Sequence, residues 1–344
     1  MYRISIAVAA SVGFFAAGLV SAGTAAAQQV VVNCTFELEW CEALRVKFEA
    51  TTGAKAAISR KTDGEVLAQI KAEAGNPRFD VWHSAGPDVA AIAAKEGYLV
   101  SYKSPKLAEL HDWAVKAAAS TNNMLTPIYT GVIGFGYNSE LLAKKNMPEP
   151  KCWADLTKPA YKDEIQMADP STSGTAYTMI TTIMQVMGDE KGFAYLKELH
   201  KNINQYTRSG TAGIRAAARG ETTIGIAFLH DSVAQAVQGF PVKTVAPCEG
   251  TGFEMPGVAI IKDAKNSEGA RKWADFVLGV DGQNVSFDMN KYQIQSNKNA
   301  KLHPLAPRAD QVKMIDYDLL KYATDDARNA ILARFDKEVK TAPK

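Results

Sequence analysis

The chain has 344 residues, of which 47% are hydrophobic and 22% are charged. This composition suffices for a large buried core, so it excludes an intrinsically disordered chain, a small disulfide scaffold and a collagen-like fibre. The 39 Lys and Arg residues nearly balance the 37 Asp and Glu residues, and a formal charge of +2 argues against a broad face for nucleic acid. Any small anion must therefore be held by local groups.

The N-terminal residues 1–27 have the order of a secretory signal peptide. Arg3 is followed by an apolar run from Ile4 to Val20 and by small residues that end in Ala25-Ala26-Ala27. The run is nearly long enough to span a bilayer, so an uncleaved membrane anchor is the alternative. The Ala, Ser and Gly content favours cleavage, and we expect an exported protein.

From residue 29 onward, short β-rich runs alternate with helical stretches. Strand, crossover helix and parallel strand in succession predict an α/β fold with doubly wound sheets. The C-terminal third is mostly helical. The expected strand and helix pairs are 30–33 with 40–51, 56–59 with 64–74, 80–82 with 88–96, 165–167 with 174–187, and, after the segment 210–219, 222–227 with 232–238.

Two β-prone segments punctuated by glycine, 126–138 and 252–261, are expected to cross between two lobes. If they run side by side, they form two β-strand hinges with a cleft between the lobes, and closure around a ligand is absorbed by a few residues at the element ends. The expected first lobe, second lobe and hinges are 28–127 with 257–344, 132–252, and about 127–132 with 252–257.

All four cysteines lie beyond the expected leader. An even number in an oxidising compartment favours disulfides over thiol chemistry or zinc, and no Cys-x-x-Cys or paired histidine spacing accompanies them. Of three possible pairings, we expect Cys34 with Cys41, from a strand end to the next helix, and Cys152 with Cys248, closing a long loop. Free buried cysteines are the alternative.

Ligands of open α/β sheets bind at the carboxyl ends of the strands, which selects five loops here. Three of them belong to the expected first lobe, and Pro87 in the third fits the first position of a helix. The candidate residues are Thr35 and Glu37 in 33–40, Thr62 beside Arg60 and Asp63 in 59–65, and Ser84 and Gly86 in 83–88.

The fourth loop, 169–175, lies between a strand and an apolar helix. Its hydroxyls and the free amides of the first helical turn suit a phosphate or carboxylate. The same residues would also make an ordinary N-cap, which is the alternative. The candidates are Ser171, Thr172, Ser173, Gly174 and Thr175.

The fifth loop contains the adjacent pair His230 and Asp231, which can exchange hydrogen bonds with vicinal hydroxyls, and Glu254 can supply another acceptor. An N-cap role for Asp231 and a half-buried, structurally satisfied His230 are the alternatives. Two arginines, Arg208 and Arg215, could reach an anion, although Arg215 and Arg219 lie four residues apart on a helix and such pairs more often form a solvated face.

The sequence contains no motif that indicates a catalytic function, since Gly-x-Ser-x-Gly, His-Glu-x-x-His and a Walker loop are all missing. A metal site built from His83, His230, Asp231 and Glu254 is conceivable, but these residues are widely separated. We expect a binding protein without catalysis, resident metal or cofactor.

Four stretches of the chain resemble the periplasmic substrate-binding proteins of ABC importers, in the cluster related to ferric-ion-binding proteins. The resemblance covers the expected mature chain almost end to end. It implies a two-lobe periplasmic-binding-protein fold (type II), a periplasmic monomer, a small anionic ligand and an ABC permease in the inner membrane as partner. The stretches are 64–73, 77–82, 134–138 and 218–226.

Ferric binders of this cluster place two neighbouring tyrosines after the strand that here ends at Ala227, because phenolate oxygens are hard ligands for Fe(III). The chain has Leu229-His230-Asp231 at that place. This pair, followed by Glu254, resembles the subgroup that binds hexose phosphates, in which the equivalent side chains hold sugar hydroxyls.

By the same resemblance, loop 171–175 and the first-lobe loops would hold the phosphate. We therefore expect a receptor for a small phosphorylated polyol. A receptor for a dicarboxylate or phosphonate is one alternative, and a metal carrier or metal-dependent hydrolase is another.

Overall fold

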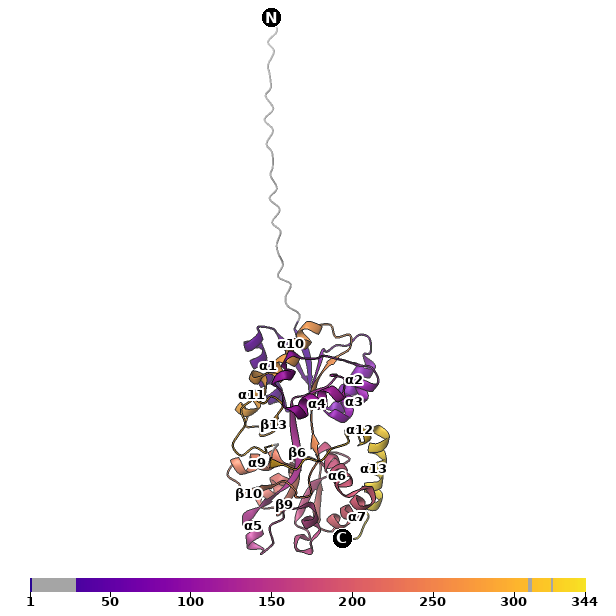
Figure 1. Cartoon of the computed structure of the whole chain (residues 1–344), viewed down its shortest axis with the longest axis vertical. Coiled ribbons are helices and arrows are strands. Elements are labelled where there is room, and N and C mark those ends of the chain that lie inside the picture. The colour runs from indigo at the N-terminus through magenta and orange to yellow at the C-terminus, as the bar shows by residue number, and fades with distance from the viewer. Residues whose placement is uncertain (2–28, 309–310, 323) are drawn as a thin grey trace.

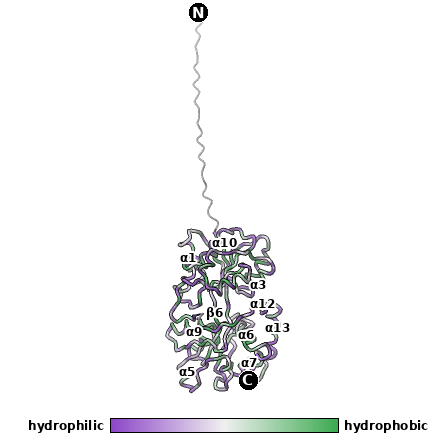
Figure 2. The backbone as a smooth tube through the Cα atoms, in the orientation of Figure 1, coloured by the Kyte–Doolittle hydropathy of each residue, from purple (hydrophilic) through white to green (hydrophobic). Residues whose placement is uncertain are grey.

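The computed structural model describes Met1 and residues 29–308, 311–322 and 324–344. The expected signal peptide therefore lies outside the described residues, apart from Met1. The described chain forms two lobes, each a β-sheet flanked by helices, and strand β6 (Tyr129–Asn138) runs between them (Figure 1). Apolar segments run through both lobes (Figure 2). The two-lobed α/β architecture is thus confirmed.

The first-lobe sheet has the strand order β2-β1-β3-β12-β4, with β5 beside β12. The expected parallel pairing holds for β1 with β2 and β3, but β12 runs antiparallel to β3, so the sheet is mixed. The strands are β1 (Val30–Cys34), β2 (Ala56–Arg60), β3 (Val81–Ala85), β4 (Leu99–Val100), β5 (Thr126–Pro127) and β12 (Gly257–Ile261).

Helices pack on this sheet around fully buried side chains such as Phe48, Trp82 and Trp273. Burial of such large apolar side chains is the dominant favourable contribution to the lobe's stability. The helices of this lobe are α1 (Leu38–Thr52), α2 (Asp63–Ala72), α3 (Pro87–Lys95), α4 (Asp112–Ser120), α10 (Ser267–Leu278) and α11 (Val280–Asp288).

The second-lobe sheet has the order β10-β6-β9-β7-β8, and β11 and β13 also pair with β6. Strands β7, β8 and β9 are parallel, whereas β6 is antiparallel to β9 and β10. The strands other than β6 are β7 (Ile165–Ala168), β8 (Ile203–Thr207), β9 (Ile224–Phe228), β10 (Val242–Val245), β11 (Phe253–Glu254) and β13 (Ile294–Gln295).

The helices of the second lobe include α9 (Leu229–Val237), which differs from expectation. It begins directly after β9, with Phe228 as its N-cap, so the predicted loop at residues 229–231 is the first helical turn. Asp231 is therefore not an N-cap. The other helices are α5 (Ser139–Lys144), α6 (Gly174–Met187), α7 (Asp189–His200) and α8 (Ala212–Arg219).

The two crossing segments run side by side in opposite directions. Glu254 of β11 pairs with Gly131 of β6, and Gly257 of β12 pairs with Pro127 of β5. A third segment joins them, since β13 pairs with β6 at Thr130. The exact lobe boundaries stay a prediction.

The C-terminal end of the chain contacts the second lobe, although we expected residues 257–344 to belong to the first. Helix α13 (Asp325–Glu338) lies beside α7 (Figure 1), and α12 (Leu319–Tyr322) contacts α3 of the first lobe and accepts a hydrogen bond from Tyr177 of α6. The reason is an apolar stripe on α13, since Ile331 and Phe335 are buried in the same hydrophobic cluster as the second-lobe sheet. Arg334 also forms an ion pair of 2.7 Å with Glu190 of α7.

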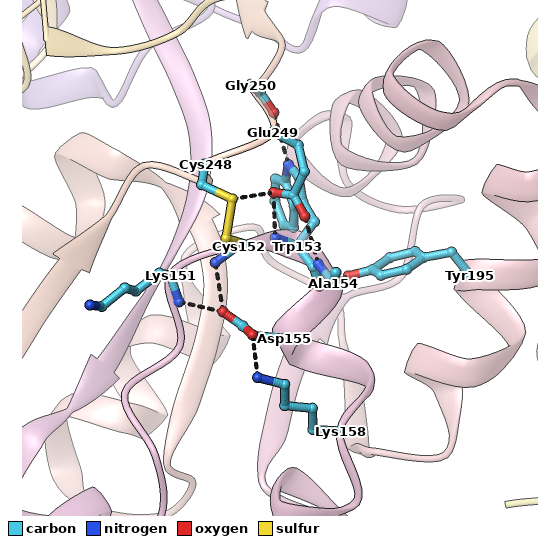
Figure 3. Close-up of a disulfide and its surroundings, with 10 residues drawn as sticks. All are labelled: Lys151, Cys152, Trp153, Ala154, Asp155, Lys158, Tyr195, Cys248, Glu249 and Gly250. Carbon is cyan, nitrogen blue, oxygen red and sulfur yellow. Dashed lines mark hydrogen bonds and ion pairs between the residues drawn. A yellow bond between two sulfur atoms is a disulfide. The ribbon is translucent and has the colours of Figure 1, made fainter.

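Both expected disulfides are present, Cys34–Cys41 and Cys152–Cys248, which confirms the predicted pairing. The second one joins a 3-10 turn (Trp153–Thr157) to the segment that leads into β11 (Figure 3). No helix of the described ranges has the length and apolar character that crossing a bilayer requires.

Candidate functional site

A cavity of about 530 Å³ lies between the lobes, a volume typical of small-ligand sites. The first lobe and the segment after α11 form one wall, the second lobe forms the other, and Tyr129 of β6 lies between them. The lining side chains are Thr35, Phe36, Glu37, Trp40, Arg60 and residues 289–293 from the first wall, and Thr175, Thr211, Arg215, Phe228, His230, Asp231, Ala234, Gln235 and Gln238 from the second.

His230 and Asp231 are brought to this cavity by the first turn of α9. The His230 ring stacks on Phe228 with centroids 5.3 Å apart, and its edge faces Tyr129 at 6.4 Å. The His230 Nε2 is 3.8 Å from Asp231 Oδ1, beyond hydrogen-bond range. Neither side chain forms a hydrogen bond with another described residue, so their polar atoms are available to a ligand.

Burial sets the charge state of this pair. It lowers the pKa of His230 to about 3, so the imidazole is neutral and offers one donor and one acceptor. Burial also raises the pKa of Asp231 to about 7, and the positive charge of Arg215 opposes this rise. The pair can therefore both donate and accept, as recognition of hydroxyl groups requires.

Glu254 lies near this pair but not in the same cavity wall. It lines a smaller cavity of about 40 Å³ with Asp88, Tyr177 and Arg328. Burial, followed by the charges of Asp88 and Asp63, raises the pKa of Glu254 to about 8. The structure thus brings His230 and Asp231 together in the large cavity and places Glu254 in a second one.

Strand β6 links the two cavities. Gly131 pairs with Glu254, and a Cβ atom at Gly131 would lie 3.0 Å from Cε1 of His230. A side chain at Gly131 would therefore displace the imidazole. Burial raises the pKa of Tyr129 well above its ordinary value, and the charges of Glu254, Glu37 and Asp231 add to this effect, so acids from both cavities surround Tyr129.

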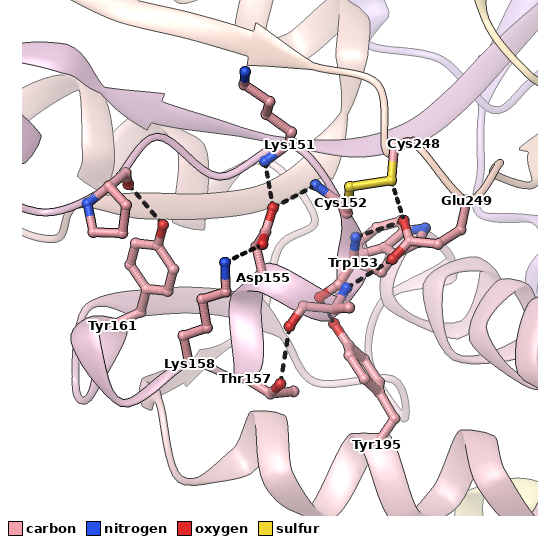
Figure 4. Close-up of polar contacts among 12 residues, drawn as sticks. Lys151, Cys152, Trp153, Asp155, Thr157, Lys158, Tyr161, Tyr195, Cys248 and Glu249 are labelled. Atoms are coloured by element: carbon pink, nitrogen blue, oxygen red, sulfur yellow. Dashed lines mark hydrogen bonds and ion pairs between the residues drawn. A yellow bond between two sulfur atoms is a disulfide. The ribbon is translucent and has the colours of Figure 1, made fainter.

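The segment carrying Glu254 is fixed by the Cys152–Cys248 disulfide and its hydrogen bonds. The Glu249 carboxylate accepts hydrogen bonds of 2.8 and 2.9 Å from the N–H groups of Trp153 and Ala154 (Figure 3). Asp155 accepts from the amides of residues 151 and 152 and pairs with Lys158 (Figure 4). These contacts hold the approach to β11 without using any group of the cavities.

Most hydroxyls of loop 171–175 are already bonded within the protein. Ser171 donates to Asp169 Oδ1 at 2.6 Å, and Thr172 donates to the carbonyls of Asp169 and Arg208 at 3.2 Å. Ser173 is the N-cap of α6, as the alternative interpretation had it. Of this loop, Thr175 lines the large cavity and Gly174 the small one.

The first-lobe candidates divide in the same way. Thr35 and Glu37 line the large cavity, and Thr35 donates to the Ser84 carbonyl at 2.5 Å. The candidates Thr62, Ser84 and Gly86 do not line the large cavity. Thr62 forms a capping box with Glu65, Ser84 is buried, and the Gly86 amide donates to Asp63 at 3.2 Å.

The sequence did not identify the aromatic wall of the cavity. Phe36 and Trp40 stack with centroids 3.9 Å apart, and Tyr129 stacks on Phe36 at 5.6 Å. The short loop closed by Cys34–Cys41 contains both Phe36 and Trp40, and this was the available signal. Lys291 follows a helix rather than a strand end, so the rule that selected the loops could not find it.

The structure does not gather His83, His230, Asp231 and Glu254, so it contradicts the alternative of a metal site built from them. His83 is buried and accepts a hydrogen bond of 3.4 Å from Trp273, and it lines neither the cavity of His230 and Asp231 nor that of Glu254. In the described part of the chain, the group of possible metal ligands found within 4.8 Å of one another is Cys152, Cys248 and Glu249, and its cysteines form a disulfide.

Comparison with known proteins gives consistent relatives. A family model described as "Bacterial extracellular solute-binding protein" matches residues 76–322. An uncharacterized protein of Haemophilus influenzae is 39% identical over 343 residues, which is 99% of each chain.

Two solved structures are similar over nearly the whole fold. The periplasmic binding protein AfuA from Actinobacillus pleuropneumoniae, solved with exogenous fructose-6-phosphate bound, has 40% identity and a TM-score of 0.81, covering 91% of this chain and 99% of that one. The periplasmic binding protein P5PA has 34% identity and a TM-score of 0.78, covering 90% and 99%.

Proposed function

The chain belongs to the bacterial extracellular solute-binding proteins and has their two-lobe type II periplasmic-binding-protein fold, and from this we propose that it is the receptor of an ABC importer for a small phosphorylated polyol. Proteins of this family are receptors, so the chain binds its solute without catalysis. A sugar phosphate is the ligand class that fits the cavity best.

The observation that carries this proposal is the adjacent pair His230 and Asp231, with no internal hydrogen bonds, in the wall of a 530 Å³ interlobe cavity. A neutral imidazole beside a carboxyl group with a pKa of about 7 suits hydroxyls better than a second strong anion. The aromatic rings of Phe36, Trp40 and Tyr129 offer an apolar surface for the carbon skeleton of the ligand.

The relative AfuA supports the proposal, since its structure was solved with fructose-6-phosphate bound and it shares 40% identity with this chain. A ferric carrier is disfavoured by side-chain chemistry, because the residues after β9 are Leu229, His230 and Asp231 rather than paired tyrosines. Transfer of the ligand to an inner-membrane permease, function as a monomer and cleavage of residues 1–27 belong to the same proposal.

The test is a calorimetric titration with fructose 6-phosphate, fructose, a dicarboxylate and a phosphonate. The Asp231→Ala variant should bind fructose 6-phosphate about 10- to 100-fold more weakly, the expected cost of losing hydrogen bonds to a carboxylate. A dicarboxylate receptor would instead tolerate or gain from the lost negative charge.

Glu268→Ala is the matched control, because Glu268 is an exposed carboxylate on α10, outside the cavity. It should bind as the wild type does. Unchanged affinity of Asp231→Ala for fructose 6-phosphate, or tight binding of a dicarboxylate alone, would contradict the proposed ligand class.

A further inference from the structure

Three cationic side chains from both lobes line the large cavity. Arg60 is the last residue of β2 and Lys291 follows α11, so both come from the first-lobe wall. Arg215 comes from α8 in the second lobe. Two of them have partners nearby, since Arg60 donates to the Phe36 carbonyl at 3.2 Å and Lys291 lies 3.4 Å from Glu37.

Arg215 is different, because among the described residues its guanidinium has no ion pair or hydrogen bond. Arg219, one turn further along α8, is bonded to Glu221 at 2.6 Å and does not line the cavity. Both arginines are exposed, as the interpretation as a solvated face predicts, but Arg215 also lines the cavity. An exposed guanidinium at the wall of a ligand cavity, with its donors unused, is available to an anion.

Close packing fixes the position of α8. A Cβ atom at Gly225 of β9 would lie 2.5 Å from backbone atoms of Gly213 and Ile214, so α8 rests directly on the strand that leads to His230. The side chain of Arg215 is thereby held on a rigid element near the hydroxyl-reading pair. Sites built on rigid helices are more precise than sites on loops.

Arg215 and Lys291 line the cavity of Asp231 from opposite walls. The charges of both oppose the rise in the pKa of Asp231 that burial produces, and that of Lys291 also acts on His230. Lys291 lies 5.4 Å from the centroid of Trp40, at the aromatic wall. Both cations thus line the cavity that contains His230 and Asp231.

Most hydroxyls of loop 171–175 are not available to bind a phosphate. Ser171, Thr172 and Ser173 are bonded within the protein, so of this loop's side chains Thr175 alone lines the large cavity. The charged side chains that line the cavity can therefore compensate a phosphate dianion in addition to the amides of the first turn of α6.

We propose that Arg215 and Lys291 clamp the phosphate from the two lobes, so that the anion, rather than the polyol, couples binding to closure of the cleft. This rests on the proposed function and adds a role for each end of the ligand. A ligand can favour the closed state only through contacts that the open state lacks, and a bridge between cations of two lobes is such a contact. A polyol without phosphate binds the second-lobe pair and leaves the lobes apart.

The experiment compares the wild type with Arg215→Gln, Lys291→Gln and the double variant. Affinities for fructose 6-phosphate, fructose and inorganic phosphate are measured by calorimetry, and closure by the decrease in the radius of gyration in solution X-ray scattering. Each single variant should lose about 10- to 100-fold in affinity for fructose 6-phosphate, with no change for fructose. The double variant should also lose the ligand-induced decrease in radius.

Arg219→Gln is the control, since it removes a cation from the same helix outside the cavity, and it should match the wild type. Unchanged thermal unfolding of Arg215→Gln verifies that the fold is intact. Affinity of Arg215→Gln within twofold of the wild type, or closure by fructose alone, overturns the inference and leaves the proposed function standing.

The two proposals fail separately. If the wild type binds a phosphonate or inorganic phosphate but no phosphorylated polyol, and this binding depends on Arg215 and Lys291, the proposed ligand is wrong and the clamp is supported. If no phosphate or phosphonate compound binds, the clamp is overturned with it.

Discussion

Replacing Asp231 with Asn should remove a pH dependence from the stability of the ligand-free receptor. Burial raises the pKa of Asp231 from an ordinary 3.8 to about 7, so the folded protein keeps a proton that the unfolded chain releases between these values. The stabilising contribution of the carboxyl group is therefore complete below about pH 4. It is lost progressively as the pH rises through about 7.

The size of the effect follows from the proton affinity. A tenfold change in affinity corresponds to about 1.4 kcal/mol, so the full rise would give about 4 kcal/mol between pH 4 and pH 8. Since 20% of the Asp231 side chain is exposed, solvent screens part of this effect. We expect the difference in unfolding free energy, Asp231→Asn minus wild type, to rise by about 2–3 kcal/mol from pH 4 to pH 8.

The assay is urea unfolding of both proteins without ligand at intervals from pH 4 to pH 9, analysed as the difference between them. His230, whose pKa is lowered, is neutral in both folded proteins, so its opposite pH dependence cancels in the difference. Glu254→Gln should show the same sign with a window that extends to about pH 8. The exposed Glu268→Gln should show no change above pH 5. A flat difference curve for Asp231→Asn would refute the reasoning.

Three further predictions concern the frame of the site. Gly131→Ala should weaken ligand binding about 3- to 10-fold, because the added Cβ would lie 3.0 Å from the His230 ring. The affinity is measured by calorimetry, and an affinity equal to that of the wild type would show that the ring has room to move. Replacing Cys152 and Cys248 by Ser should lower the free energy of urea unfolding by about 2–4 kcal/mol, since this disulfide closes a loop with a sequence separation of 96. An unchanged free energy of unfolding would mean that the loop is already restrained in the unfolded chain. Arg328→Gln removes an ion pair of 3.7 Å between Arg328 of α13 and Asp88 of α3. Because this pair links the two lobes, its loss should speed ligand release about two- to fivefold in stopped-flow measurements. An unchanged rate of release would argue that the pair does not hold the lobes together.

The local parts of this protein could be predicted from the sequence. Alternating strand and helix patterns gave the α/β class, because hydrophobic periodicity and turn residues act over a few neighbours. Both disulfides followed from the number of cysteines and their position along the chain. His230 and Asp231 were identified because the carboxyl end of a strand determines where a following side chain emerges.

The features that could not be predicted depend on contacts between residues that are distant in the sequence. The start of α9 at Leu229 and the docking of α13 on the second lobe depend on what packs against them. The hydroxyls of loop 171–175 suited an anion in sequence, but Asp169 and the capping of α6 use them in the fold.

The sequence alone thus determined most of the elements, the covalent links and two side chains that line the cavity, His230 and Asp231. Only the tertiary structure decided that Lys291, after α11, and Arg215 of α8 line the same cavity as Asp231. The physical reason is range, since propensity and periodicity act between neighbours in the chain. The packing of one lobe against the other includes contacts such as that of Arg328 on α13 with Asp88 on α3, which no local pattern specifies.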